Sequence, residues 1–145
     1  MNHADMTKSR LLAVDDNSDS AELIARVAAK CGYDARSMTD PSALGRVLDE
    51  WKPQVLTLDL CMPEEDGISV LSLLTQSGFS GHLLIISGQD EWFRKTASRL
   101  ASARGLNVAD DLCKPVDLKA LRELLVQLAN GGRTVGEQRR AANGE

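Results

Sequence analysis

The sequence predicts an α/β domain in which helices cover both faces of a parallel β-sheet. Short apolar runs alternate five times with longer segments whose apolar residues recur at helical spacing. Polar residues end four of these runs, and the carboxyl ends of parallel strands meet at one edge of a sheet. A chain of 145 residues is long enough to bury a single core of this kind.

The first part of the chain is expected to form three strands and two helices. The strands are the apolar runs at 11–14, 35–38 and 55–60. The first helix begins at a capping residue, Ser18 or Asp19, and ends at about Cys31, because Gly32 is a typical helix stop. Asp40-Pro41 is an N-cap followed by proline at the first helical position, so the second helix begins there and reaches about Trp51.

The second part is expected to continue the alternation. A third helix opens at Asp66-Gly67 and ends near Gly78, and further strands cover 83–86 and 108–113. A long fourth helix runs from Glu91 to Arg104, and a fifth begins after Pro115. The fifth helix carries a leucine stripe that we expect to face the core, and we expect the adjacent pair Trp92-Phe93 to pack as well.

Composition limits the function classes. The net charge of −4 argues against nucleic acid as a partner, because no basic stripe is present to neutralise phosphates. No apolar run approaches the roughly 18 residues of a membrane span, and we expect a cytoplasmic protein. We expect residues 1–8 to be a disordered start, 9–130 the folded domain, and 131–145 a disordered tail or linker.

The polar residues at the strand ends form a chemically coherent set. A flavodoxin-like strand order, 2-1-3-4-5, would place the first and third strands side by side and bring Asp15 and Asp16 next to Asp59. Such carboxylates repel one another unless a cation compensates, and Mg²⁺ prefers oxygen ligands of this type. A carboxylate can itself be a nucleophile for a phosphoryl group, with Lys114 supplying positive charge and Ser87 a hydrogen bond.

The segment from Asp59 to Gly67, with Asp15-Asp16, Ser87 and Lys114-Pro115, resembles the signatures of bacterial response-regulator receiver domains of the CheY-like type. Each motif alone is weak, since it also suits a helix cap or a turn, but the four in this order are specific. The resemblance implies that Asp59 accepts a phosphoryl group from a sensor histidine kinase, a histidine phosphotransfer protein or a small phosphodonor.

The resemblance also implies a role for each remaining site residue. Asp16, Asp59 and the backbone carbonyl of Cys61 would bind Mg²⁺, with Asp15 helping through water. Lys114 and Ser87 would bind the phosphoryl group, Pro115 would follow a cis peptide bond, and Cys61 and Gln89 would tune hydrolysis. The fourth helix, fifth strand and fifth helix would form the switching surface for a downstream protein, an output domain or a second copy of the chain.

Two departures from the family pattern concern the relay of the signal. The family usually has an aromatic residue three places before the lysine, and this chain has Asp111 there. Ser87 and Lys114 are 27 positions apart, about one helical turn more than usual, which lengthens the fourth helix. Both features are similar to receivers joined to cyclic-di-GMP phosphodiesterase domains.

Two alternative functions remain open on the sequence. A pseudo-receiver would be a protein-interaction module that works without phosphorylation, and Asp111 keeps this hypothesis open. A phosphatase of the haloacid-dehalogenase type would also use an aspartyl phosphate, Mg²⁺, a hydroxyl and a lysine. That family needs a second aspartate two places after the nucleophile, where this chain has Cys61, so we expect a domain that is not an enzyme beyond its own phosphorylation and dephosphorylation.

Overall fold

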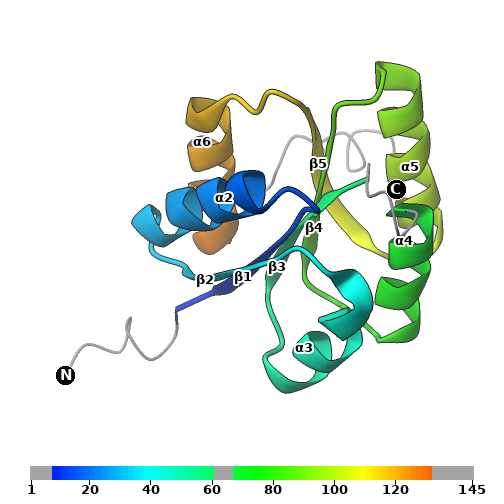
Figure 1. The fold of residues 1–145 in the computed structure, drawn as a ribbon, viewed down its shortest axis with the longest axis horizontal. Coiled ribbons are helices and arrows are strands. Elements are labelled where there is room, and N and C mark those ends of the chain that lie inside the picture. Colours follow the sequence, from blue (N-terminus) through cyan, green and yellow to red (C-terminus); the bar gives the residue numbers. More distant parts are fainter. Residues whose placement is uncertain (1–7, 61–66, 132–145) are drawn as a thin grey trace.

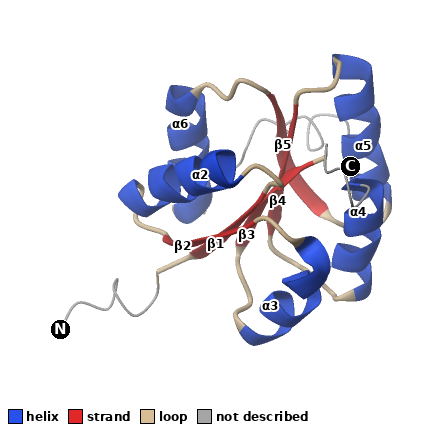
Figure 2. Ribbon diagram, in the orientation of Figure 1, coloured by secondary structure: helices blue, strands red, loops and turns tan. Residues whose placement is uncertain are grey.

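The computed structural model describes residues 8–60 and 67–131, which form a parallel sheet flanked by helices (Figures 1 and 2). Its five strands follow the order β2-β1-β3-β4-β5, and every neighbouring pair is parallel. This is the predicted flavodoxin-like order, so the predicted fold class is confirmed. The strands are β1 (Arg10–Val14), β2 (Asp34–Met38), β3 (Val55–Asp59), β4 (His82–Ser87) and β5 (Asn107–Cys113).

Helices cover both faces of the sheet. One face carries α2 (Ser18–Lys30) and α6 (Leu118–Ala129), which lie side by side in Figure 1. The other face carries α3 (Leu44–Glu50), α4 (Gly67–Gln76) and α5 (Glu91–Ala103). The second predicted helix begins as a 3₁₀ turn, η1 (Pro41–Ala43), which Asp40 caps before the chain continues into α3.

Two apolar clusters lie on the two faces because successive strand side chains point in opposite directions. Leu12 and Leu58 pack toward α3, α4 and α5, whereas Leu11 and Val55 pack toward α2 and α6. All five residues of β3 are buried, as expected for a central strand covered on both sides. This burial fixes the direction and register of the strand that ends at Asp59.

The predicted leucine stripe of α6 faces the core, where Leu121, Leu124, Leu125 and Leu128 are buried. The packing predicted for Trp92 is wrong, because this side chain is 74% exposed. Asp90 caps α5, and one helical residue turns the side-chain direction by about 100°. Phe93 therefore packs against the core while Trp92, one position earlier, faces solvent.

Several predicted features lie outside the described residues. They include Cys61, most of the predicted start (1–7) and the tail (132–145). Across the described parts of the chain, the helices are too short or too polar to span a membrane.

Candidate functional site

The predicted site residues meet at the carboxyl edge of the sheet. Asp15 directly follows β1, Asp59 ends β3, Ser87 ends β4 and Lys114 directly follows β5. The register pairs Val14 with Leu58, which places Asp15 beside Asp59. It also pairs Ser87 with Cys113, and the Lys114 amide donates to the Ser87 carbonyl at 3.0 Å. Residues up to 99 positions apart are thus neighbours.

Asp15, Asp16 and Asp59 form a compact acidic cluster. One carboxylate oxygen from each lies within 4.8 Å of the others. Asp15 and Asp59 are almost fully buried, whereas Asp16 is exposed. Two buried anions with a third at the mouth need a compensating cation, and all the donors are hard oxygens. The donor set therefore fits Mg²⁺.

Lys114 supplies a cation to two of these carboxylates. Its Nζ donates to Asp15 Oδ2 at 2.9 Å and to Asp59 Oδ2 at 3.0 Å. Burial alone would lower the pKa of Lys114, but the hydrogen bonds and charges of Asp15 and Asp59 outweigh it and raise the pKa. The two carboxylates therefore favour the charged ammonium form of Lys114 beside Asp59. The following peptide bond, Lys114-Pro115, is cis.

Backbone contacts hold the remaining polar groups in place. Ser87 is fully buried, and its Oγ accepts a hydrogen bond from the Gln89 amide at 3.0 Å. Asp15 Oδ1 accepts from the Asn17 amide at 3.0 Å, and Asn17 in turn caps α2. The loops that carry the site are thus tied to the starts of α5 and α2. Cys61, predicted as a metal ligand and a tuning residue, lies outside the described residues.

One ion cluster near the site was missed by sequence reasoning. Asp111 on β5 pairs with Arg94 Nε at 3.0 Å and with Lys95 Nζ at 3.0 Å, both on α5. The sequence shows an acidic residue in place of the family aromatic, but it does not show which cations face it. The adjacent basic residues Arg94 and Lys95, near the start of the helix that packs on β5, were the sequence signal for these ion pairs.

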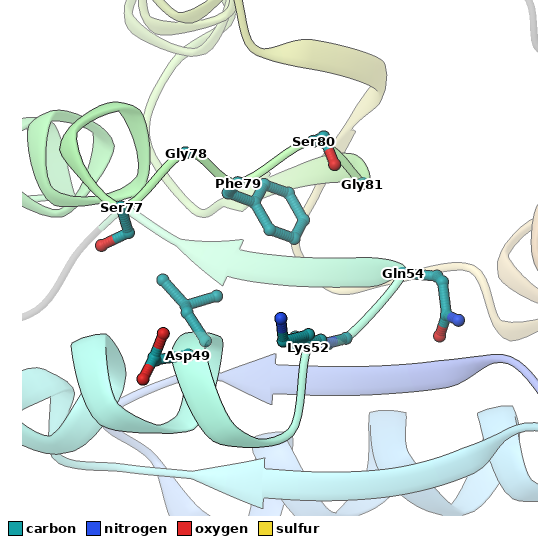
Figure 3. A pocket seen from close by; sticks show the side chains of 10 residues that line it. Asp49, Lys52, Gln54, Ser77, Gly78, Phe79, Ser80 and Gly81 are labelled. Carbon is teal, nitrogen blue, oxygen red and sulfur yellow. The ribbon is translucent and has the colours of Figure 1, made fainter.

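Two hollows flank the sheet at opposite ends. An apolar groove of about 530 Å³ lies between α2 and the loop after β5, and it is lined by Leu23, Ile24, Val116, Leu118 and the site residue Lys114, among others. A second hollow, of about 370 Å³, lies where the chain enters β3 and β4 (Figure 3). Asp49 and Lys52 line one wall and Phe79 the other. This hollow is at the start of β3, whereas Asp59 is at the end of that strand. The first groove is therefore the one that belongs to the acidic site.

The parallel sheet in the order β2-β1-β3-β4-β5 and the acidic edge with its lysine are the two features to compare with known proteins. The family model described as "Response regulator receiver domain" matches residues 11–126, and the chain belongs to this family. Receiver domains are signalling domains of two-component systems rather than classical enzymes. The comparisons do not support the narrower resemblance to receivers joined to phosphodiesterase domains.

Individual relatives agree with this assignment. The response regulator MprA of Mycobacterium leprae is 30% identical over 119 residues, which cover 82% of this chain and 49% of MprA. A protein-glutamate methylesterase/protein-glutamine glutaminase of Archaeoglobus fulgidus is 29% identical, covering 81% of this chain and 34% of that protein. The chain thus spans half or less of these curated relatives. A response-regulator crystal structure from Colwellia psychrerythraea superposes with a TM-score of 0.77 at 29% identity, covering 86% of this chain and 99% of that one.

Proposed function

We propose that this domain receives a phosphoryl group on Asp59 with the help of Mg²⁺, and that phosphorylation switches the surface made of α5, β5 and α6. The observation that carries the proposal is the convergence of three carboxylates and one ammonium at the end of β3. A metal cluster alone would not need the lysine. The Lys114 ammonium, which pairs with Asp59, is suited to bind the negative oxygens of a phosphoryl group attached to that carboxylate.

The proposed reaction transfers a phosphoryl group from a nitrogen or oxygen atom of the donor to a carboxylate oxygen of Asp59. An Asp59 carboxylate oxygen attacks the phosphorus of a phosphohistidine or an acyl phosphate, forming an acyl phosphate on Asp59. The bond from phosphorus to the donor breaks, and the donor leaves as imidazole or carboxylate with the electron pair. Mg²⁺ held by Asp15, Asp16 and Asp59 would neutralise negative charge on the phosphoryl oxygens.

The chain's own residues orient the group that is transferred. Lys114 Nζ already lies 3.0 Å from Asp59 Oδ2, so it can bind a phosphoryl oxygen with little movement. Ser87 Oγ accepts from the Gln89 amide in the present state, and its own proton remains available to donate to an incoming oxygen. Gln89, on the same loop, is proposed to influence the rate of hydrolysis. Cys61 is proposed to contribute its carbonyl to the metal and its side chain to the rate of hydrolysis.

The phosphodonor is proposed to be a histidine-containing protein that docks on the apolar groove between α2 and the loop after β5. Receiver domains interact with histidine kinases or phosphotransfer proteins, and a donor must bring its phosphorus to Asp59. The groove is lined by Lys114 itself, and Leu23 at its edge is 41% exposed. Apolar contacts between the donor protein and this groove would place the donor's phosphohistidine beside the acidic edge.

Intact-mass spectrometry after incubation with acetyl phosphate and Mg²⁺ tests the proposal. We expect wild-type protein to gain the mass of one phosphoryl group and Asp59→Asn to gain none. Asp49→Asn is the matched control, because Asp49 is exposed and lies at the other end of the sheet. An adduct that persists in Asp59→Asn, or its absence from the wild type, would refute the phosphoacceptor role.

A second candidate is a pseudo-receiver that binds its partner without phosphorylation. The ion cluster of Asp111 with Arg94 and Lys95 favours it, because it holds α5 against β5 with no phosphoryl group involved. Under this alternative, the Asp59→Ala variant binds the cognate partner as tightly as the wild type with and without acetyl phosphate. A partner affinity that depends on phosphorylation excludes it.

A further inference from the structure

Asp111 faces α5 because β5 contains a β-bulge. Val108 pairs with Leu83, but the next pair joins Leu84 to Asp110, so Ala109 is an extra residue in β5. Val108 packs on the α5 side of the sheet. With simple alternation from Val108, the side chain of residue 111 would point to the sheet face covered by α2 and α6. The extra residue instead brings it to the face covered by α5. The bulge therefore turns a carboxylate toward α5 at the place where the family has an aromatic ring.

The Asp111 carboxylate is partly buried and is bound by two cations from consecutive helix positions. Its side chain is 8% exposed, against 12% for Arg94 and 34% for Lys95. Arg94 Nε donates to Oδ1 at 3.0 Å, and Lys95 Nζ lies 3.0 Å from Oδ1 and 3.1 Å from Oδ2. We call these three residues the Asp111 latch. A partly buried carboxylate that loses both cations is less well compensated, so opening of the latch has a cost that another interaction must offset.

Both sides of the latch lead directly to the acidic site. On β5, Asp111 lies three residues before Lys114, which binds Asp15 and Asp59. On the other side, Ser87 Oγ binds the Gln89 amide, and Asp90 Oδ1 caps α5 by accepting from the Phe93 amide at 2.8 Å. Arg94 follows within the first turns of the same helix. Four to seven residues of chain, held by these hydrogen bonds, therefore connect the loop between Ser87 and Asp90 to the latch.

We propose that Asp111 is a positioning residue that takes over the relay role of the missing aromatic: the closed Asp111 latch holds α5 against β5 in the unphosphorylated state and opens on phosphorylation. This inference rests on the proposed phosphorylation of Asp59. A phosphoryl group that engages Ser87 and Lys114 moves both chain segments that carry the latch. Hydrogen bonds of about 3 Å lose their geometry when the two elements shift by about 1 Å, so a small displacement at the site is converted into release of α5.

Hydrogen exchange of the full chain, followed by mass spectrometry, tests the relay while the same spectra report phosphoryl occupancy. In the wild type, phosphorylation with acetyl phosphate and Mg²⁺ is expected to speed amide exchange in residues 91–97 by about fivefold or more. Asp111→Asn keeps the shape but removes the charge. It should show the fast exchange before phosphorylation, and phosphorylation should then add less than about twofold.

Asp110→Asn is the matched control, because it makes the same charge change one residue away from the latch. Asp110 Oδ1 accepts from the Asp111 amide, a contact that an asparagine oxygen preserves. This variant should behave as the wild type. Lys95→Gln, at the most exposed member of the latch, should shift exchange in the same direction as Asp111→Asn, which keeps the test decisive if Asp111→Asn does not fold.

The outcomes separate the two proposals. A wild-type protein that takes up no phosphoryl group overturns the proposed function and the relay together. A phosphorylated wild type whose residues 91–97 do not change, or an Asp111→Asn variant that responds as Asp110→Asn does, overturns the relay and leaves phosphorylation of Asp59 intact.

Discussion

Replacing Lys114 by methionine isolates the electrostatic balance at the acidic edge. The change keeps the aliphatic length but removes the ammonium from Asp15 and Asp59, whose side chains are 1% and 3% exposed. Removing one partner of a buried ion pair costs about 3–5 kcal/mol. The Lys114 side chain is 28% exposed, so water screens part of this interaction and we expect a loss of about 2–3 kcal/mol.

Thermal unfolding measures this loss directly. For a domain of this size, about 2–3 kcal/mol corresponds to a decrease in Tm of roughly 6–10 °C. Lys119→Met is the matched control, because Lys119 is exposed on α6 and its change should alter stability by less than about 0.5 kcal/mol. Because Lys114→Met leaves Asp15 and Asp59 without the ammonium, Mg²⁺ should stabilise this variant more than it stabilises the wild type.

A Lys114→Met protein with the Tm of the wild type would refute this reasoning. It would mean that the two buried carboxylates do not depend on the lysine for compensation. An equal Mg²⁺-dependent increase in Tm for Lys114→Met and wild type would refute the second part, namely that the ammonium and the metal share the same anions.

Three further predictions concern stability. Mg²⁺ at ten times its Kd should stabilise the wild type by about 1.4 kcal/mol in thermal unfolding. If Mg²⁺ stabilises Asp16→Asn by the same amount, Asp16 does not contribute to metal binding. Among described residues, Thr57 Oγ1 is a buried oxygen without a hydrogen-bond partner, so Thr57→Val should raise stability by about 1 kcal/mol in urea unfolding, and a loss would contradict this. Burial, with a smaller contribution from Cys31, raises the pKa of Tyr33 from 10.0 to about 12, so the folded state holds its phenol proton longer than the unfolded state. Wild-type stability should therefore fall between about pH 10 and 12 by more than that of Tyr33→Phe, and parallel pH profiles would exclude this coupling.

The strands and helices were predictable because they depend on local patterns, whereas the strand order does not follow from pattern and entered as the flavodoxin-like hypothesis that the sheet confirms. The short apolar run that became β3, Val55–Asp59, indicated a buried strand, and the cap at Asp40 followed by Pro41 marked where a helix begins. Once the strand order is 2-1-3-4-5, the edge that gathers Asp15 and Asp59 follows from the topology.

The Asp111 latch and the exposure of Trp92 were not predictable, because each depends on the angular position of a side chain rather than on its spacing. The bulge at Ala109 reverses the face of Asp111, and no residue type in β5 announces it. The cap at Asp90 sets the start of α5, and in the turn that follows Trp92 faces solvent while Phe93 packs against the core. Single-residue register of this kind is decided by tertiary packing.

Localising the phosphoryl group tests the central claim most directly. Protein treated with acetyl phosphate and Mg²⁺ is reduced with borohydride, which converts an aspartyl phosphate to homoserine, and the peptides are sequenced by tandem mass spectrometry. We expect homoserine at position 59 and unchanged aspartate at Asp15 and Asp16. Homoserine at position 15 or 16, or a phosphoryl group that survives on Ser87, would contradict it.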